Sequence, residues 1–131
     1  MAINPSAFDN VKVLRIPVAS PQKLFEVTGE ALVEFSTDSQ DSADFVRDDL
    51  VFVVPREDGG EALNVGHLVD SAVDAFVATA QSNVGWGVDT AESVVNPDDP
   101  DGKTVQVTAR VALAGEGVIE RIGFRVSILA F

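Results

Sequence analysis

The residues best suited to catalysis lie close together in the middle of the chain. His67, the only histidine, precedes Asp70, Ser71 and Asp74. A histidine, a serine and a carboxylate can act as base, nucleophile and orienting group when their side chains converge. The hydrophobic spacing predicts an amphipathic helix over residues 61–81, which would place these side chains in one stripe. Such a stripe suits solvent contact better than an aligned nucleophile, so we favour a solvated helix face over a catalytic site.

Two further segments contain residue types that bind ligands in other proteins. The run Asp98–Gly102 has the carboxylate density of a calcium loop, but no glutamate follows at EF-hand spacing, and Asx turns explain the run as well. Trp86, the only tryptophan, lies between Gly85 and Gly87, and we favour a core or interface role for it over a ligand site. The chain contains no Walker, G-x-S-x-G, H-E-x-x-H or dinucleotide-binding motif. We expect no metal and no cofactor, and leave open whether the acidic loop binds a cation.

Composition narrows the class of protein. The chain has 131 residues, which we expect to form a single domain, and no cysteine, which excludes disulfides and thiolate metal sites. Twenty-one acidic residues against nine basic ones give a net charge of −12, and this surface repels phosphate backbones, so we expect no direct sequence-specific nucleic-acid binding. No apolar run approaches the roughly 20 residues of a membrane span, and the amino terminus lacks the pattern of a secretory signal. We therefore expect no membrane partner.

The choice of charged residues also bears on the source. Aspartate outnumbers glutamate and only three of the basic residues are lysines. Such Asp-rich, Lys-poor surfaces are typical of proteins from halophilic organisms, although a GC-rich genome also suppresses lysine codons. We favour the halophilic interpretation, because a strongly acidic surface destabilises the compact state unless salt screens it.

The elements that must position these residues are mainly strands. Apolar and polar residues alternate over residues 104–113 and again over 119–128, with a glycine-bearing turn between them, which predicts a terminal hairpin. Similar patterns predict further strands over residues 11–18, 25–35, 50–54 and 84–88. Together with the helix at about 61–81 they indicate a mainly-β (α+β) fold, an antiparallel β-sandwich or strongly twisted sheet with one packed helix, preceded by an irregular arm at residues 1–10.

The two ends of the chain suggest where it makes contacts. Leu129 and Phe131 fall on the face of the last strand opposite its core residues, so that strand should be apolar on both sides. A second subunit is a natural cover for the extra apolar face. We expect interface roles for Ile3 and Phe8 in the arm, for Trp86, and for Leu129 and Phe131.

In general form the chain resembles small structural subunits of tailed-virus particles, of the capsid-decoration and tail-tube or connector types. The features that carry the resemblance are the arm at 1–10, the sandwich with a helix at 61–81 and the hairpin at 104–131. It implies a non-enzymatic structural protein of the virion, assembled in the host cytoplasm as a homo-oligomer that also contacts other virion proteins. It implies no catalytic residues.

A second resemblance belongs to a different class. Gly66-His67-Leu68-Val69-Asp70 on a long helix, followed by antiparallel strands, looks somewhat like the hotdog-fold acyl-CoA thioesterases and dehydratases. That resemblance implies that Asp70 or Asp74 activates water while the region of His67 positions the thioester. The usual His-Gly-Gly before the helix is absent, and three strands precede the helix where that fold generally has fewer. We rank this alternative second.

Overall fold

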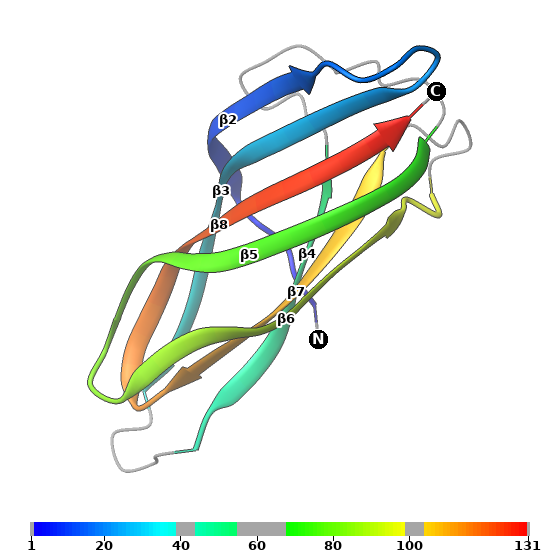
Figure 1. Cartoon of the computed structure of the whole chain (residues 1–131). Coiled ribbons are helices and arrows are strands. Elements are labelled where there is room, and N and C mark those ends of the chain that lie inside the picture. Colours follow the sequence, from blue (N-terminus) through cyan, green and yellow to red (C-terminus); the bar gives the residue numbers. More distant parts are fainter. Residues whose placement is uncertain (1, 39–43, 55–67, 99–103, 131) are drawn as a thin grey trace.

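The fold is a two-layered β-sandwich. The computed structural model describes residues 2–38, 44–54, 68–98 and 104–130. Their regular secondary structure consists of two four-stranded sheets packed face to face (Figure 1). Sheet A has the order β1 (Ala2–Ile3), β4 (Val46–Val54), β7 (Val105–Ala114), β6 (Gly85–Val95). Sheet B has the order β2 (Ala7–Ile16), β3 (Lys23–Asp38), β8 (Glu116–Ala130), β5 (Leu68–Ser82).

Neighbouring strands are antiparallel in both sheets, apart from β1, which runs parallel to β4. The mainly-β, sandwich-like part of the expected fold therefore agrees with the structure. None of the described residues belongs to a helix that is long and apolar enough to cross a membrane.

The core lies between the sheets and follows the alternation of the sequence. Every second residue is buried from Val105 to Leu113 in β7 and from Ile122 to Ala130 in β8, and the same holds from Phe25 to Phe35 in β3 apart from Gly29. Three aromatic rings meet at its centre: the Phe52 and Phe124 centroids are 4.9 Å apart, and Phe8 lies edge-on to both at 5.6 and 6.0 Å. Gly29 makes room for one of these rings, because a Cβ atom there would lie 2.9 Å from Cζ of Phe124.

The predicted helix over 61–81 is wrong. Residues 61–67 lie outside the described part of the chain, and residues 68–82 form β5, which pairs with β8 along its length. Half-buried Val73, Ala75 and Val77 alternate with exposed residues. Small or apolar residues occur on both faces of this strand, so the two-residue period is masked and three- and four-residue spacings arise by coincidence. The unpaired edge of β8 overrides the local helix propensity, because its backbone groups need partners.

The predicted terminal hairpin has the right strands but the wrong pairing. β7 belongs to sheet A and β8 to sheet B, and Gly115, with a φ of 73°, turns the chain from one sheet to the other. The link from β5 to β6 also crosses from sheet B to sheet A, next to the crossing at Gly115. Asn83 joins the two crossings, since its Oδ1 accepts a hydrogen bond of 2.8 Å from the amide of Glu116. β5 and β6, and likewise β7 and β8, thus belong to different sheets although they follow each other in the chain.

Residues 1–10 also differ from the expected irregular arm. Ala2 and Ile3 form β1 beside β4 in sheet A, and β2 begins at Ala7 in sheet B. Between them Ser6 donates from its backbone amide to the carbonyl of Leu32 at 2.9 Å. The amino-terminal segment contributes a strand to each sheet because Ile3 and Phe8 both pack against the core.

Two strands are longer than predicted. The strand expected over 84–88 extends to Val95 as β6. The strand expected over 50–54 begins at Val46, and only one of its faces is buried: Val51 and Val53 remain half-buried on the outer face of sheet A.

Candidate interaction surfaces

The outer face of sheet B has an apolar patch at the end where β8 finishes. Ile16, Leu24 and Leu129 lie side by side in one row across β2, β3 and β8. Leu14 projects from the same face one row away and is 60% exposed. We call these four residues the Leu129 patch. A depression of about 150 Å³ continues it between β8 and β5. Exposed apolar patches with a polar rim often mark interaction sites.

Ion pairs join charged side chains on the outer face of sheet B. Nη1 of Arg121 lies 2.9 Å from Oδ2 of Asp9 and 3.3 Å from Oε1 of Glu30. The hydrogen bond from Arg121 lowers the pKa of Asp9 below its ordinary value, and the backbone amide of Asn10 adds to this effect. The Asp9 carboxylate in turn raises the pKa of Arg121. Arg125 pairs with Glu26 between this cluster and the Leu129 patch.

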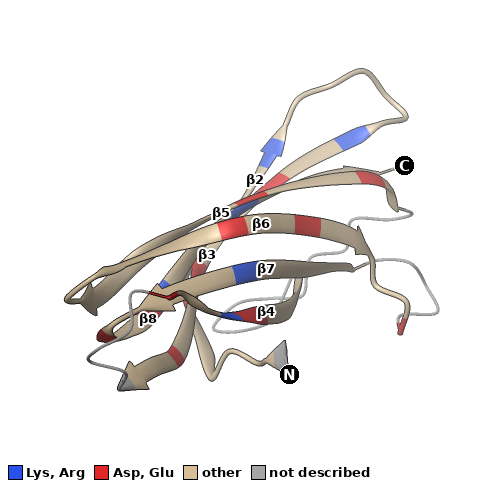
Figure 2. Cartoon of the chain, turned by 90° about the horizontal axis from the view of Figure 1, so that it is seen from below, with Lys and Arg blue, Asp and Glu red and all other residues tan. Residues whose placement is uncertain are grey.

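Charge is divided unevenly between the two long sides of the sandwich. The sequence contains no lysine or arginine between Arg56 and Lys103, so every charged side chain of β5 and β6 is acidic. These are Asp70, Asp74, Asp89 and Glu92. The opposite side, formed by β2 and the start of β3, has Lys12, Arg15 and Lys23, and its acidic residues Asp9 and Glu26 are paired with Arg121 and Arg125. Figure 2 shows the division, with red segments on β6 and blue ones at the ends of β2 and β3.

Trp86 belongs to a second exposed apolar group at the opposite end of the sandwich. It lies in β6, opposite Leu113, whose other neighbour in sheet A is Val46. Leu113 is fully buried, whereas Trp86 is 45% and Val46 46% exposed. Val84, in the crossing between β5 and β6, is 50% exposed. The side chain of Trp86 therefore exposes nearly half of its surface to solvent at this end of the sandwich.

The residues expected at an interface have different environments. Ile3 and Phe8 are half-buried and pack against the core, so their side chains serve the fold directly. Leu129 is half-buried on the outer face, as its position opposite the core residues of β8 predicted. Phe131 lies outside the described residues.

Among the candidate catalytic residues that the structure describes, the side chains do not converge on one site. Ser71 faces β6, where its Oγ lies 2.9 Å from Oγ of Ser93. Asp70 and Asp74 belong to the outer face, in the rows of Leu129 and Arg125. His67 lies outside the described residues. Because 68–82 is a strand, the helix that supported the hotdog resemblance is missing from this segment.

The structure describes the acidic loop only as far as Asp98, and this part forms a turn. The amide of Asp98 donates to Oδ1 of Asn96 at 3.1 Å, an Asx turn of the expected kind. Residues 99–103 lie outside the described part of the chain. Within the residues that the structure describes, no group of three or more histidine, cysteine or acidic side chains could hold a metal ion.

Sequence reasoning missed most of the Leu129 patch. Leu14, Ile16 and Leu24 lie in strands that the alternation predicted in large part, but only the pairing of β2, β3 and β8 places them in contact. A usable signal was parity within each strand: Leu24 alternates with the core residue Phe25 of β3, and Leu14 and Ile16 have the opposite parity to Val11 of β2, which packs against the core.

The fold defines the chain as a β-sandwich with exposed apolar patches and unequally charged sides. No family model, no curated protein and no solved structure matches the sequence or the fold.

Proposed function

We propose that this protein is a non-enzymatic structural subunit that assembles with copies of itself in the particle of a tailed virus, as a capsid-decoration or tail-tube or connector protein. The Leu129 patch is the observation that supports the proposal most directly. It lies on a sheet rather than in a loop, so its geometry is rigid, and it borders the edge strand β2. Rigid apolar surfaces beside an unpaired strand edge favour stable contact with another protein.

The charge of the protein is compatible with this role. Acidic residues outnumber basic ones by more than two to one. A particle that encloses nucleic acid benefits from walls that do not bind it, because phosphate contacts depend on basic side chains. The same charge opposes association of identical copies at low ionic strength, and molar salt screens the repulsion between charges that are farther apart than the Debye length of about 3 Å.

The test is the mass of the protein in solution, by light scattering behind a sizing column in low and molar salt. We expect a discrete multimer, favoured by salt, and electron microscopy should then show closed rings, tubes or small symmetric oligomers. Leu129→Ser should shift the population to monomer without unfolding it. Val53→Ser, at a half-buried position on the outer face of sheet A, is the matched control and should assemble normally. A wild-type monomer at every salt and protein concentration would overturn the proposal.

A further inference from the structure

The two outer strands of sheet B run in opposite directions. The order β2-β3-β8-β5 has three antiparallel pairings, so β2 and β5 are themselves antiparallel. We infer that the partner of the β2 edge is the β5 edge of a second copy of this chain, in a head-to-tail contact that continues sheet B between subunits. This inference rests on the self-assembly proposed above and specifies its geometry.

Charge selects this contact over a two-fold contact between two β2 edges. The β2 side presents Lys12 and Arg15, and the β5 side presents Asp70 and Asp74. A head-to-tail contact therefore brings basic residues against acidic ones, which favours correct docking. A two-fold contact would place the basic side of one copy against the basic side of the next. Edge strands commonly use lysine to prevent such self-pairing.

The row structure of the outer face indicates which side chains meet. In the register of the strands, Lys12 lies opposite Thr28, Thr28 lies opposite Arg125, and Arg125 lies opposite Asp74. One row thus begins with Lys12 at the β2 edge and ends with Asp74 at the β5 edge. Neither Lys12 nor Asp74 forms an ion pair with any residue in the described part of the chain. When the next copy continues the sheet without an offset, Lys12 lies beside Asp74 of its neighbour.

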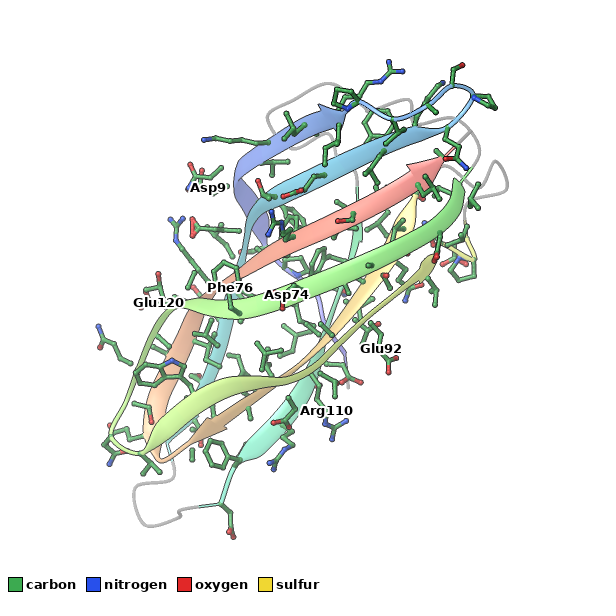
Figure 3. All side chains as sticks on the ribbon, viewed as in Figure 1. Asp9, Asp74, Phe76, Glu92, Arg110 and Glu120 are labelled. Carbon is green, nitrogen blue, oxygen red and sulfur yellow. The ribbon has the colours of Figure 1, made fainter. Side chains whose placement is uncertain are left out.

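The next row supplies an apolar contact of the same kind. Leu14, in register with Glu26, begins this row at the β2 edge, and Ala72, in register with Ser127, ends it at the β5 edge. Leu14 is the most exposed of the large apolar side chains in the described residues, and Ala72 is exposed as well. In the head-to-tail contact Leu14 packs over Ala72 of the neighbour. Figure 3 shows Asp74 and Phe76 on β5, at the opposite edge of sheet B from Asp9 on β2.

A head-to-tail contact has a defined consequence for symmetry. Each copy uses two different surfaces, so the contact is heterologous, and it closes into a ring when the rotation between copies divides a full turn. The Leu129 patch includes residues of both β2 and β8, and therefore borders this contact.

The experiment is a charge reversal on the full-length protein, read as the assembly constant by light scattering at moderate salt. Lys12→Asp and Asp74→Lys should each weaken assembly by about tenfold or more, because each places like charges opposite each other. The double variant Lys12→Asp/Asp74→Lys restores opposite charges and should recover assembly. An equimolar mixture of the two single variants should also assemble, with the variants alternating. Circular dichroism checks that each variant is folded.

The controls change the charge by the same amount elsewhere. Arg110→Asp, on the outer face of sheet A, matches Lys12→Asp, and Glu120→Lys, on the central strand of sheet B, matches Asp74→Lys (Figure 3). Both controls should assemble like the wild type. Where Asp74→Lys fails to fold because of the nearby Arg125, Ala72→Lys replaces it. That change sets an ammonium group next to Lys12 of the neighbour and opposite its Leu14, and should weaken assembly through like-charge repulsion and loss of the apolar contact.

The outcomes separate this inference from the proposed function. A wild-type protein that is monomeric throughout refutes both. A wild type that assembles while both single variants assemble equally well refutes the head-to-tail contact alone. Loss of assembly in the single variants without recovery in the double variant or in the mixture also refutes the pairing of Lys12 with Asp74.

Discussion

The ring of Phe76 lies over Gly123 on the outer face of sheet B. The two residues are direct partners across β5 and β8, and a Cβ atom on Gly123 would clash with Cε2 and Cζ of the ring. Phe76 is 55% exposed, whereas Gly123 is buried. An exposed aromatic ring thus shields a stretch of backbone that has no side chain of its own, which is a known way of stabilising a glycine within a sheet.

This relationship predicts a coupling between the two positions. Phe76→Ala should destabilise the fold by about 1 kcal/mol, the upper range for a cross-strand pair. Gly123→Ala should cost more in the wild type than in the Phe76→Ala background, because the clash with the ring is absent there. Chemical denaturation of the two single variants and the double variant should give a coupling of about 0.5 kcal/mol or more. Additive effects would show that the ring and the glycine act independently.

The crossing at Gly115 predicts a strong glycine requirement. Its φ of 73° is left-handed, and a Cβ atom would clash with Oδ1 of Asn83 and lie 2.6 Å from Cγ2 of Val84. Gly115→Ala should therefore cost more than the roughly 1–2 kcal/mol of the left-handed conformation alone. Gly87→Ala is the matched control, because no atom lies within 4 Å of a Cβ there, and it should change stability by less than about 0.5 kcal/mol. Equal costs at the two sites would contradict the expected strain.

The ion pair between Arg121 and Asp9 predicts a pH dependence. The pKa of Asp9 is lower in the folded state than its ordinary value of 3.8, so the carboxylate stabilises the fold above that pH. This contribution is lost as the pH falls through the lowered folded-state pKa. Asp9→Asn should therefore be less stable than the wild type at neutral pH, and the difference should close in acid. Urea unfolding at a series of pH values measures both curves, and a constant gap would refute the assignment.

The net charge of −12 predicts a strong response to salt. Repulsion among the acidic side chains destabilises the folded state, and molar salt screens it. We expect the melting temperature to rise by more than about 4 °C between low-millimolar and molar KCl, a shift that corresponds to roughly 1 kcal/mol. Thermal denaturation followed by circular dichroism is sufficient. A melting temperature indifferent to salt would also count against a halophilic source.

Phe8 predicts that the amino-terminal segment is needed for folding. Its ring packs edge-on against Phe52 and Phe124, and the segment supplies strands to both sheets. Phe8→Ala should cost about 2 kcal/mol or more, somewhat below the value for a fully buried phenylalanine. Deletion of residues 1–8 should lower stability further. A truncated protein with the wild-type midpoint in urea would show that the segment is dispensable for the fold.

Much of the sheet structure could be predicted because its alternation is unbroken. In β7 and β8 the inward positions are apolar and most outward ones polar, so the two-residue period is plain. In β5 the alternation fails because alanine, valine and phenylalanine occupy both faces. The helix prediction failed there for that reason. The hairpin prediction failed for another, since a short glycine turn serves equally for strands in one sheet or in two.

The candidate surface was predictable only in part. Leu129 could be identified because its parity differs from that of its core neighbours within the same strand. Its contact with Leu24 and Ile16 could not, since these residues come from strands more than a hundred positions away.

By itself the sequence determined the strands with clean alternation, the faces of those strands that enter the core, and the acidic character of the protein, because these depend on local order and composition. The tertiary structure alone decided that residues 68–82 are a strand, that β7 and β8 belong to different sheets, and that Lys12 and Asp74 begin and end one row. Those outcomes depend on which backbone edges find hydrogen-bond partners, and that choice is made between segments distant in the chain.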